Sequence, residues 1–160
     1  MELINKTLSQ ILDEQTLLYP DKEFVIFPEK NIRLTYLQFS ELVDKVARGL
    51  FALDVQKGDH IAVWSQNNHY WVILMFAIAK IGAVMLTVNT AYKTTDFEYV
   101  LRQSDAKILF LTRGAGLAHN YNNFIEIIET LIPALKTEKN KENIKTSDFP
   151  ELKKIVLIEE

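Results

Sequence analysis

The densest apolar stretch of the chain, residues 60–92, predicts a β-α-β unit. Residues 60–65 and 84–88 are apolar runs rich in β-branched side chains, as expected of parallel strands buried on both faces. Between them, residues 69–81 form an apolar run of core-helix length that ends before Gly82. A right-handed crossover through this helix would place both strands in one sheet.

The pattern upstream of this unit predicts two helices and a hairpin. Each helix begins with the spacing of a capping box, in which a threonine is followed three residues later by a glutamine: these pairs are Thr7 with Gln10 and Thr35 with Gln38. Two short extended runs, residues 24–27 and 32–34, are separated by a turn and indicate a hairpin.

Helix and strand continue to alternate downstream. Thr95 and Glu98 are expected to cap a helix, residues 123–132 form another, and residues 107–112 and 154–158 are expected strands. This alternation predicts an α/β fold, with a doubly wound, mostly parallel sheet flanked by helices and preceded by the short N-terminal helix and hairpin.

Two downstream segments are interpreted as loops. Gly114 and Gly116 follow a strand as in a dinucleotide-binding GxGxxG motif, but His119 occupies the third glycine position, so the glycines are interpreted as a turn. Residues 136–148 are polar and densely charged, and we expect them to form a mobile loop.

Composition narrows the class of protein. A length of 160 residues suits one domain, and a net charge of −3 does not favour nucleic acid as a partner. The absence of cysteine excludes disulfides and thiolate metal sites, and with no signal-peptide pattern it favours a cytoplasmic location. Lys80 and Gly82 interrupt the apolar run from Tyr70 to Val88, so no transmembrane segment is expected, while peripheral contact with a membrane stays open.

Familiar catalytic motifs are missing from the sequence. It contains no GxxxxGK[ST] phosphate loop, no GxSxG elbow and no HExxH zinc motif. His60, His69 and His119 are too scattered for a local ligand cluster, so no metal site is predicted. The large aromatic residues of the central unit are assigned to the core rather than to a cofactor site: Trp64, Trp71 and Phe76.

A series of short motifs nevertheless resembles one family. In order, they are LTYLQFSEL at 34–42, KGDHIAV at 57–63, AKIGAV at 79–84, VNTAY at 88–92 and EYVL at 98–101. Their number, order and spacing over about the whole chain resemble the N-terminal part of adenylate-forming (AMP-binding) acyl-CoA synthetases. The last two variants look most similar to the fatty-acyl-CoA ligase branch.

This resemblance implies a two-step ligase reaction. The carboxylate of a fatty acid, or of another acid, attacks the α-phosphate of ATP to give an acyl-adenylate and pyrophosphate. The thiol of coenzyme A then displaces AMP, and Mg²⁺ accompanies the phosphates. The family's phosphate loop, its aromatic-Gly-x-Thr-Glu segment, its adenine- and ribose-binding aspartate and the lysine of its small C-terminal domain would all lie after residue 160, so no catalytic residue can be assigned here.

The resemblance also defines what residues 1–160 are expected to be. They correspond to the N-terminal portion of the large adenylation domain, ending before the phosphate loop. We therefore expect this segment to act as a scaffold, to be inactive alone and to bind no cofactor tightly. Its partner would be the C-terminal part of the same chain.

Lys93 is the candidate cofactor-binding residue. In some family members, a basic residue in the loop after the strand-ending asparagine, here Asn89, contacts a phosphate of coenzyme A. The nearest matching position is Ala91, and Lys93 lies two residues further on. The alternative is an ordinary solvated surface lysine.

Two alternative functions remain open from the sequence. The first is a self-contained flavodoxin-like nucleotide-binding module, whose candidate ligand turns would be residues 65–68 and 89–94 at the carboxyl ends of the strands. The second is a non-enzymatic interaction domain. That class predicts an apolar surface patch larger than a few hundred Å².

Overall fold

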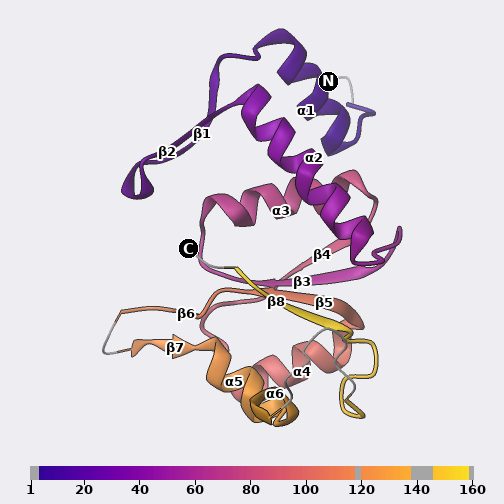
Figure 1. Ribbon diagram of the computed structural model, residues 1–160, viewed down its shortest axis with the longest axis vertical. Helices are drawn as coiled ribbons and strands as arrows, with labels where there is room; N and C mark the ends of the chain where they lie inside the picture. The colour runs from indigo at the N-terminus through magenta and orange to yellow at the C-terminus, as the bar shows by residue number, and fades with distance from the viewer. Residues whose placement is uncertain (1–3, 118–119, 138–145, 159–160) are drawn as a thin grey trace. The chain divides into compact units, whose positions relative to one another are not determined.

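The computed structural model describes residues 4–117, 120–137 and 146–158, which belong to two compact units (Figure 1). Unit 1 combines Met1–Lys57 with Asn68–Ala83. Unit 2 combines Gly58–Asn67 with Val84–Glu160.

Unit 1 contains the predicted N-terminal helix, the hairpin and two further helices. In chain order its elements are α1 (Leu8–Leu18), β1 (Glu23–Phe27), the short 3₁₀ helix η1 (Pro28–Lys30), β2 (Ile32–Thr35), α2 (Tyr36–Ala52) and α3 (His69–Lys80). Strands β1 and β2 pair antiparallel, which confirms the hairpin. Both predicted capping boxes are present, with Thr7 Oγ1 accepting from Gln10 N at 3.2 Å and Thr35 Oγ1 accepting from Gln38 N at 3.3 Å.

Helix α3 begins at His69, as the sequence indicated, and ends at Lys80, one residue before the predicted end at Ile81. Asn68 caps its first turn by accepting a hydrogen bond from Trp71 N at 2.9 Å. At its end, Gly82 has φ +74°, and Ala83 N donates to Ile78 O at 3.1 Å. This is a glycine-terminated helix end, because only glycine adopts the left-handed backbone there without strain.

A cluster of aromatic rings lies within the mainly aliphatic core of unit 1. Phe24 of the hairpin stacks on Tyr36 with ring centroids 4.5 Å apart and meets Phe39 edge-on at 4.9 Å. Phe39 in turn meets Phe76 of α3 at 5.2 Å, which confirms Phe76 as a core residue. These contacts join β1, α2 and α3 through apolar surface.

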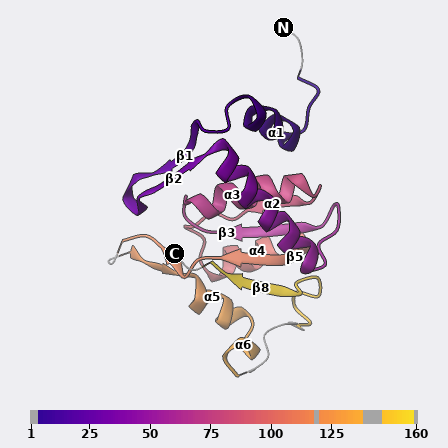
Figure 2. The ribbon, with the colours of Figure 1, turned by 45° about the horizontal axis from the view of Figure 1, so that its top comes forward.

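Unit 2 contains the sheet. Its elements are β3 (His60–Trp64), β4 (Val84–Thr87), α4 (Thr94–Ser104), β5 (Ala106–Leu111), β6 (Gly114–Ala115), β7 (Asn122–Asn123), α5 (Phe124–Leu131), α6 (Ala134–Thr137) and β8 (Lys154–Leu157). The four main strands pair in the order β4-β3-β5-β8 and all run parallel, as Figure 2 shows for β3, β5 and β8. The predicted α/β class and parallel sheet are confirmed.

The strand order places a switch point between β3 and β5. From β3 the chain continues to one neighbour, β4, and then crosses to the opposite side of β3 to form β5. Open α/β sheets bind ligands outside the carboxyl ends of the strands at such a point.

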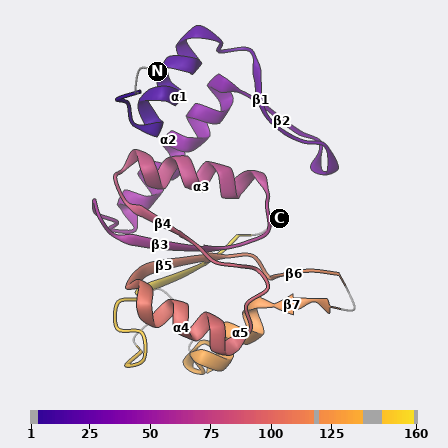
Figure 3. The same ribbon diagram turned by 180° about the vertical axis from the view of Figure 1, so that it is seen from behind.

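Helices α4 and α5 lie on the same side of the sheet (Figures 1 and 3) and bury a stacked aromatic group. The ring of Trp64 in β3 stacks against Phe97 of α4 at 3.8 Å and against Phe124 of α5 at 4.0 Å, and all three side chains are buried. Trp64 is therefore a core residue, as predicted. Trp71 of unit 1 is only half-buried.

The start of α4 corrects one prediction. The helix begins two residues earlier than expected, with Lys93 rather than Thr95 as its N-cap, and Asp96 rather than Glu98 accepts the cap N–H, at 3.3 Å. Glu98 instead pairs with Arg102 one turn later, at 2.8 Å. An acidic residue near a helix start can serve either role, and spacing alone does not distinguish them.

A second correction concerns the segment that was interpreted as a plain turn. Residues 114–115 and 122–123 form the short antiparallel β6–β7 hairpin, which extends away from the sheet (Figure 3). A Cβ at Gly114 would lie 2.3 Å from Asn122 O and 2.5 Å from the Tyr121 ring, so the glycine permits this close strand pairing. His119 lies outside the described residues.

Two further predictions concern the loop at 136–148 and the membrane-spanning segments. The expected loop at 136–148 falls largely on residues 138–145, which are outside it, while Lys136 and Thr137 belong to α6. Among the residues that the structure describes, no helix is both long and apolar enough to cross a membrane.

Candidate ligand site at the carboxyl ends of the strands

The carboxyl ends of three parallel strands meet at one edge of the unit 2 sheet. Trp64 of β3 is in register with Leu111 of β5, and Val63 is in register with Thr87 of β4. The turns that follow these strands therefore begin side by side. Both turns named from the sequence as candidate ligand loops, 65–68 and 89–94, start at this edge.

A cavity of about 300 Å³ opens at this edge. Its walls come from the turn after β3, the turn after β4 and the β6–β7 hairpin, and they consist of Gln66, Thr90, Ala91, Lys93, Ala115, Gly116, Asn120 and Asn122. The structure thus brings the sequence candidate Lys93 together with residues almost thirty positions further along the chain.

The turn that carries Lys93 is fixed by Asn89. The Asn89 side chain accepts a hydrogen bond from Ala91 N at 2.9 Å, and its backbone carbonyl accepts one from Tyr92 N at 3.1 Å. The same carbonyl accepts a bond from Trp64 Nε1 at 3.1 Å. Asn89 thus satisfies backbone and side-chain donors in the turn after β4.

Asn122 connects this turn to the β6–β7 hairpin. Its Nδ2 donates to the backbone carbonyls of Thr90 at 2.9 Å and Tyr92 at 2.7 Å, and its Oδ1 accepts from Lys93 Nζ at 3.1 Å. The Asn122 side chain is 5% exposed, so these bonds satisfy a buried amide. The Lys93 side chain is exposed apart from this contact.

The electrostatics of the cavity favour an anion or a polar neutral group. Lys93 is the one charged side chain among the described lining residues, and the remaining polar lining atoms belong to amides, a hydroxyl and the backbone. The N–H of Lys93 at the start of α4 is already bonded to the Asp96 carboxylate. The ammonium group, not the helix terminus, is therefore the cationic feature of this site.

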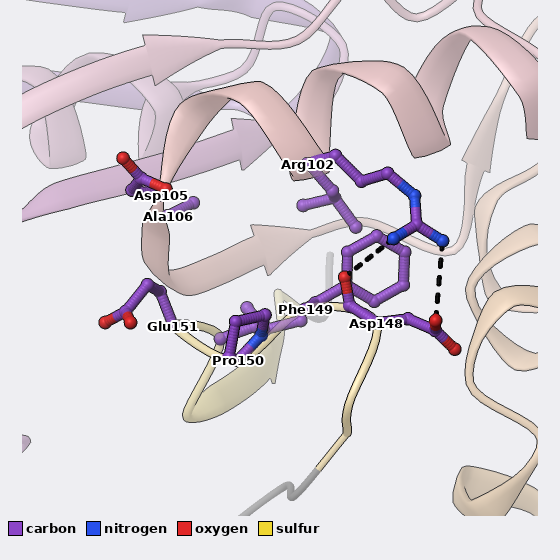
Figure 4. A pocket seen from close by; sticks show the side chains of 9 residues that line it. Arg102, Asp105, Ala106, Asp148, Phe149, Pro150 and Glu151 are labelled. Carbon is purple, nitrogen blue, oxygen red and sulfur yellow. Dashed lines mark hydrogen bonds and ion pairs between the residues drawn. The ribbon is translucent and has the colours of Figure 1, made fainter.

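A smaller cavity of about 170 Å³ lies between α4 and the segment that precedes β8. Figure 4 shows its one basic side chain, Arg102, pointing toward Asp148 with the Phe149 ring beside it. The Arg102 guanidinium bonds Glu98 at 2.8 Å and the Asp148 carbonyl at 3.0 Å, and it lies 5.1 Å from the Phe149 ring centroid. The hydrogen bond to Glu98 is the main reason why the pKa of Arg102 is raised.

This second cavity is a poor anion site. Its basic side chain is already paired with two acidic residues, and Asp105 and Glu151 add further negative charge to the lining. We interpret it as a structural ion-pair network, because its guanidinium holds the segment before β8 against α4.

The two described histidines, His60 and His69, lie in separate environments. His60 contacts the Ser104 carbonyl through Nδ1 at 2.6 Å, and His69 packs at the start of α3 against Phe27 and Tyr70. Within the described residues, no group of three or more histidine, aspartate or glutamate side chains could hold a metal ion.

The comparisons with known proteins identify the family. The profile of the AMP-binding enzyme family matches residues 12–159. The chain belongs to the AMP-binding enzyme family. The match covers nearly every described element of both units, which agrees with the resemblance found in the sequence motifs.

Individual relatives of this AMP-binding protein are acyl-CoA ligases by name. The Bacillus subtilis (strain 168) protein YngI, which carries the name of an acyl-CoA synthetase, is 38% identical over 157 residues, 98% of this chain and 28% of its own. The mitochondrial medium-chain acyl-CoA ligase ACSF2 of Rattus norvegicus is 30% identical over 98% of this chain and 25% of its own. The chain thus spans about a quarter of the length of these relatives.

Solved structures of AMP-binding proteins share the fold. A Mycobacterium tuberculosis fatty acyl CoA synthetase superposes with a TM-score of 0.73 at 21% identity, over 95% of this chain and 26% of its own. The anthranilate CoA ligase AuaEII, solved with anthranoyl-AMP, gives a TM-score of 0.75 at 23% identity, over 98% of this chain and 26% of its own. At these identities the likeness concerns the fold alone.

Proposed function

We propose that this chain is the amino-terminal portion of an ATP-dependent acid–thiol ligase that joins a fatty or medium-chain carboxylic acid to coenzyme A. The observation that carries the proposal is the family match over residues 12–159, together with two relatives that are named acyl-CoA ligases. In the proposed reaction, a carboxylate oxygen bonds to the α-phosphorus of ATP and pyrophosphate leaves. The coenzyme A thiol then loses its proton, its sulfur bonds to the acyl carbon, and AMP leaves.

The residues of this chain have two proposed roles in that reaction. The parallel sheet of unit 2 is the scaffold. The cavity of about 300 Å³ that Lys93 lines at the carboxyl ends of the strands, called the carboxyl-edge cavity below, contributes to binding coenzyme A. Lys93 Nζ has three donors, of which the described contacts use one, so it can also donate to a phosphate oxygen. We assign Mg²⁺ to no residue of this chain. A cytoplasmic location is also proposed, on the absence of cysteine.

The scaffold role is tested by comparing this 160-residue chain with the protein encoded by the complete reading frame that contains it. We expect the complete protein to exchange pyrophosphate with ATP when a medium-chain or fatty acid is present, and this chain alone to give no exchange. Exchange by this chain alone would refute the scaffold role. No exchange by either protein, with a panel of carboxylic acids, would instead favour a binding module or an interaction domain.

The coenzyme A contact is tested in the complete protein with Lys93→Met. We expect the KM for coenzyme A to rise roughly tenfold, because a partly exposed charge-assisted contact is lost, and to rise more than the KM for ATP or for the acid. Lys45→Met is the matched control, since Lys45 is an exposed lysine of unit 1 that does not line the cavity. Equal kinetic constants for the two variants would remove Lys93 from the site.

A further inference from the structure

We propose that Asn122 is a positioning residue that holds the Lys93 ammonium at the carboxyl-edge cavity. This inference rests on the proposed coenzyme A contact for its functional meaning, but its structural part does not depend on that contact. Asn122 belongs to β7, in a segment where the sequence indicated neither a strand nor a site. Only the folded chain brings it to Lys93, 3.1 Å away.

The hydrogen-bond pattern fixes which way the Asn122 amide points. Its two Nδ2 hydrogens meet two carbonyl oxygens, of Thr90 and Tyr92, while its Oδ1 meets an ammonium group. The flipped amide would set an oxygen against two carbonyls and an NH₂ group against a cation. That orientation has no favourable bond, so a single orientation is stable.

Asparagine is well suited to this position. The side chain must donate to two backbone acceptors and also accept from an ammonium group, within a space that leaves it 5% exposed. Aspartate would keep the acceptor for Lys93 but lose both donors, and an apolar residue would lose all three bonds. The amide therefore serves both the backbone of the turn and the charged side chain that the turn presents.

The benefit to ligand binding is pre-organisation. A lysine side chain has four rotatable carbon–carbon torsions and loses conformational freedom when its ammonium is held by a ligand. The bond from Lys93 Nζ to Asn122 already restricts that freedom, since the Asn122 amide is anchored by its two backbone contacts. A phosphate group bound at Lys93 would meet an ammonium that is already in place.

A first experiment measures the position of Lys93 directly. In the complete protein, acetylation of Lys93 by an amine-reactive ester is followed by mass spectrometry, with the exposed Lys45 as internal reference. We expect Asn122→Ala to increase the relative rate at Lys93 about two- to fivefold, while Asn122→Asp stays at or below the wild-type rate, because its carboxylate accepts from the ammonium and favours the protonated form. Equal rates in Asn122→Ala and the wild type, or equal increases in both variants, would overturn the proposal.

A second experiment measures the effect on coenzyme A. We expect Asn122→Ala to raise the KM for coenzyme A about three- to tenfold, and to raise it no further in a Lys93→Met background, because the effect passes through Lys93. If Asn122→Ala raises the KM for coenzyme A by the same factor in the wild-type and in the Lys93→Met protein, its role is merely structural and the proposal is overturned. If Lys93→Met alone leaves the KM unchanged, the coenzyme A contact fails, and the acetylation rates still decide whether Asn122 positions Lys93.

Discussion

Trp64 and Asn89 are joined by a hydrogen bond of 3.1 Å from the indole Nε1 to the backbone carbonyl. Trp64 is the last residue of β3, and Asn89 begins the turn after β4 that leads to Lys93. The aromatic core beneath the sheet and the cavity at its edge are therefore connected by one side chain. This hydrogen bond helps to hold the turn at residues 89–94, which contains no glycine, next to the carboxyl-edge cavity.

The Trp64 bond should make a measurable contribution to stability. Trp64→Phe keeps an aromatic ring in the stack but removes the indole donor, so that the Asn89 carbonyl keeps only its bond from Tyr92 N, and we expect the free energy of unfolding to fall by about 1 kcal/mol. Urea denaturation followed by circular dichroism measures the change. Trp71→Phe, at a half-buried position of unit 1, is the control and should have a smaller effect. Equal losses in the two variants would contradict a special role for the Trp64 bond.

Lys80 forms ion pairs that link three helices of unit 1. Its Nζ on α3 lies 2.6 Å from Asp44 of α2 and 3.3 Å from Asp13 of α1. Partial burial lowers the pKa of Lys80, but the bonds to Asp44 and Asp13 outweigh it, so the pKa is raised. We expect Lys80→Met, which keeps the apolar stem, to lower the free energy of unfolding by about 1 kcal/mol at neutral pH.

The raised pKa of Lys80 also predicts a pH dependence. A group with a raised folded-state pKa stabilises fully below its unfolded value, about 10.4 for lysine, and loses that contribution as the pH rises through the folded value. The stability difference between wild type and Lys80→Met should thus be constant from neutral pH to about pH 10 and shrink above it. Denaturation curves of both proteins across this range measure it. A difference that grows with alkaline pH would disprove the charge pairing.

Replacing each of two glycines by alanine should change the free energy of unfolding in opposite directions. Gly114→Ala would set a Cβ 2.3 Å from Asn122 O, and we expect a loss of about 1–3 kcal/mol together with distortion of the cavity wall. Gly49→Ala, in the last turn of α2 with no atom within 4 Å of the new Cβ, should stabilise by about 0.5 kcal/mol. Thermal denaturation of both variants measures the two signs. A Gly114→Ala protein as stable as wild type would mean that the β6–β7 pairing is not as close as described.

The capping box at the start of α2 can be tested with a conservative pair. Thr35→Ala removes the hydroxyl that accepts from Gln38 N, and we expect a loss of about 1 kcal/mol. Thr35→Ser keeps the hydroxyl and should recover most of that stability. The midpoints of urea denaturation give both values, and an identical midpoint for the two variants would show that the cap contributes nothing.

Prediction from sequence succeeded where local chemistry decides structure. Both Thr–Gln capping boxes, the end of α3 at Gly82 and the hairpin of β1 and β2 follow from short-range hydrogen bonding and backbone preference, so residues within a few positions of one another determine them. The apolar runs also predicted parallel strands, because burial on both faces requires continuous hydrophobicity. The exact start of α4 was missed, since Asp96 and Glu98 both suit a helix start.

The candidate site was only partly predictable. The family resemblance indicated Lys93, and the two turns after β3 and β4 were indicated because ligands of parallel α/β sheets bind at the carboxyl ends of strands. The sequence indicated neither the β6–β7 hairpin nor Asn122. Those two strands are too short to show an alternating pattern, and one asparagine in a polar segment has no local signal that distinguishes it from a surface residue.

The sequence by itself determined the family, the α/β class and the caps of α1 and α2, because these depend on motif order, hydrophobic periodicity and local hydrogen bonds. Tertiary structure alone decided that Asn122 meets Lys93 and that Trp64 holds the turn at Asn89. These contacts join residues 25 or more positions apart, and their partners are chosen by strand pairing and packing rather than by spacing along the chain. The cavity at the carboxyl edge is therefore a property of the folded chain.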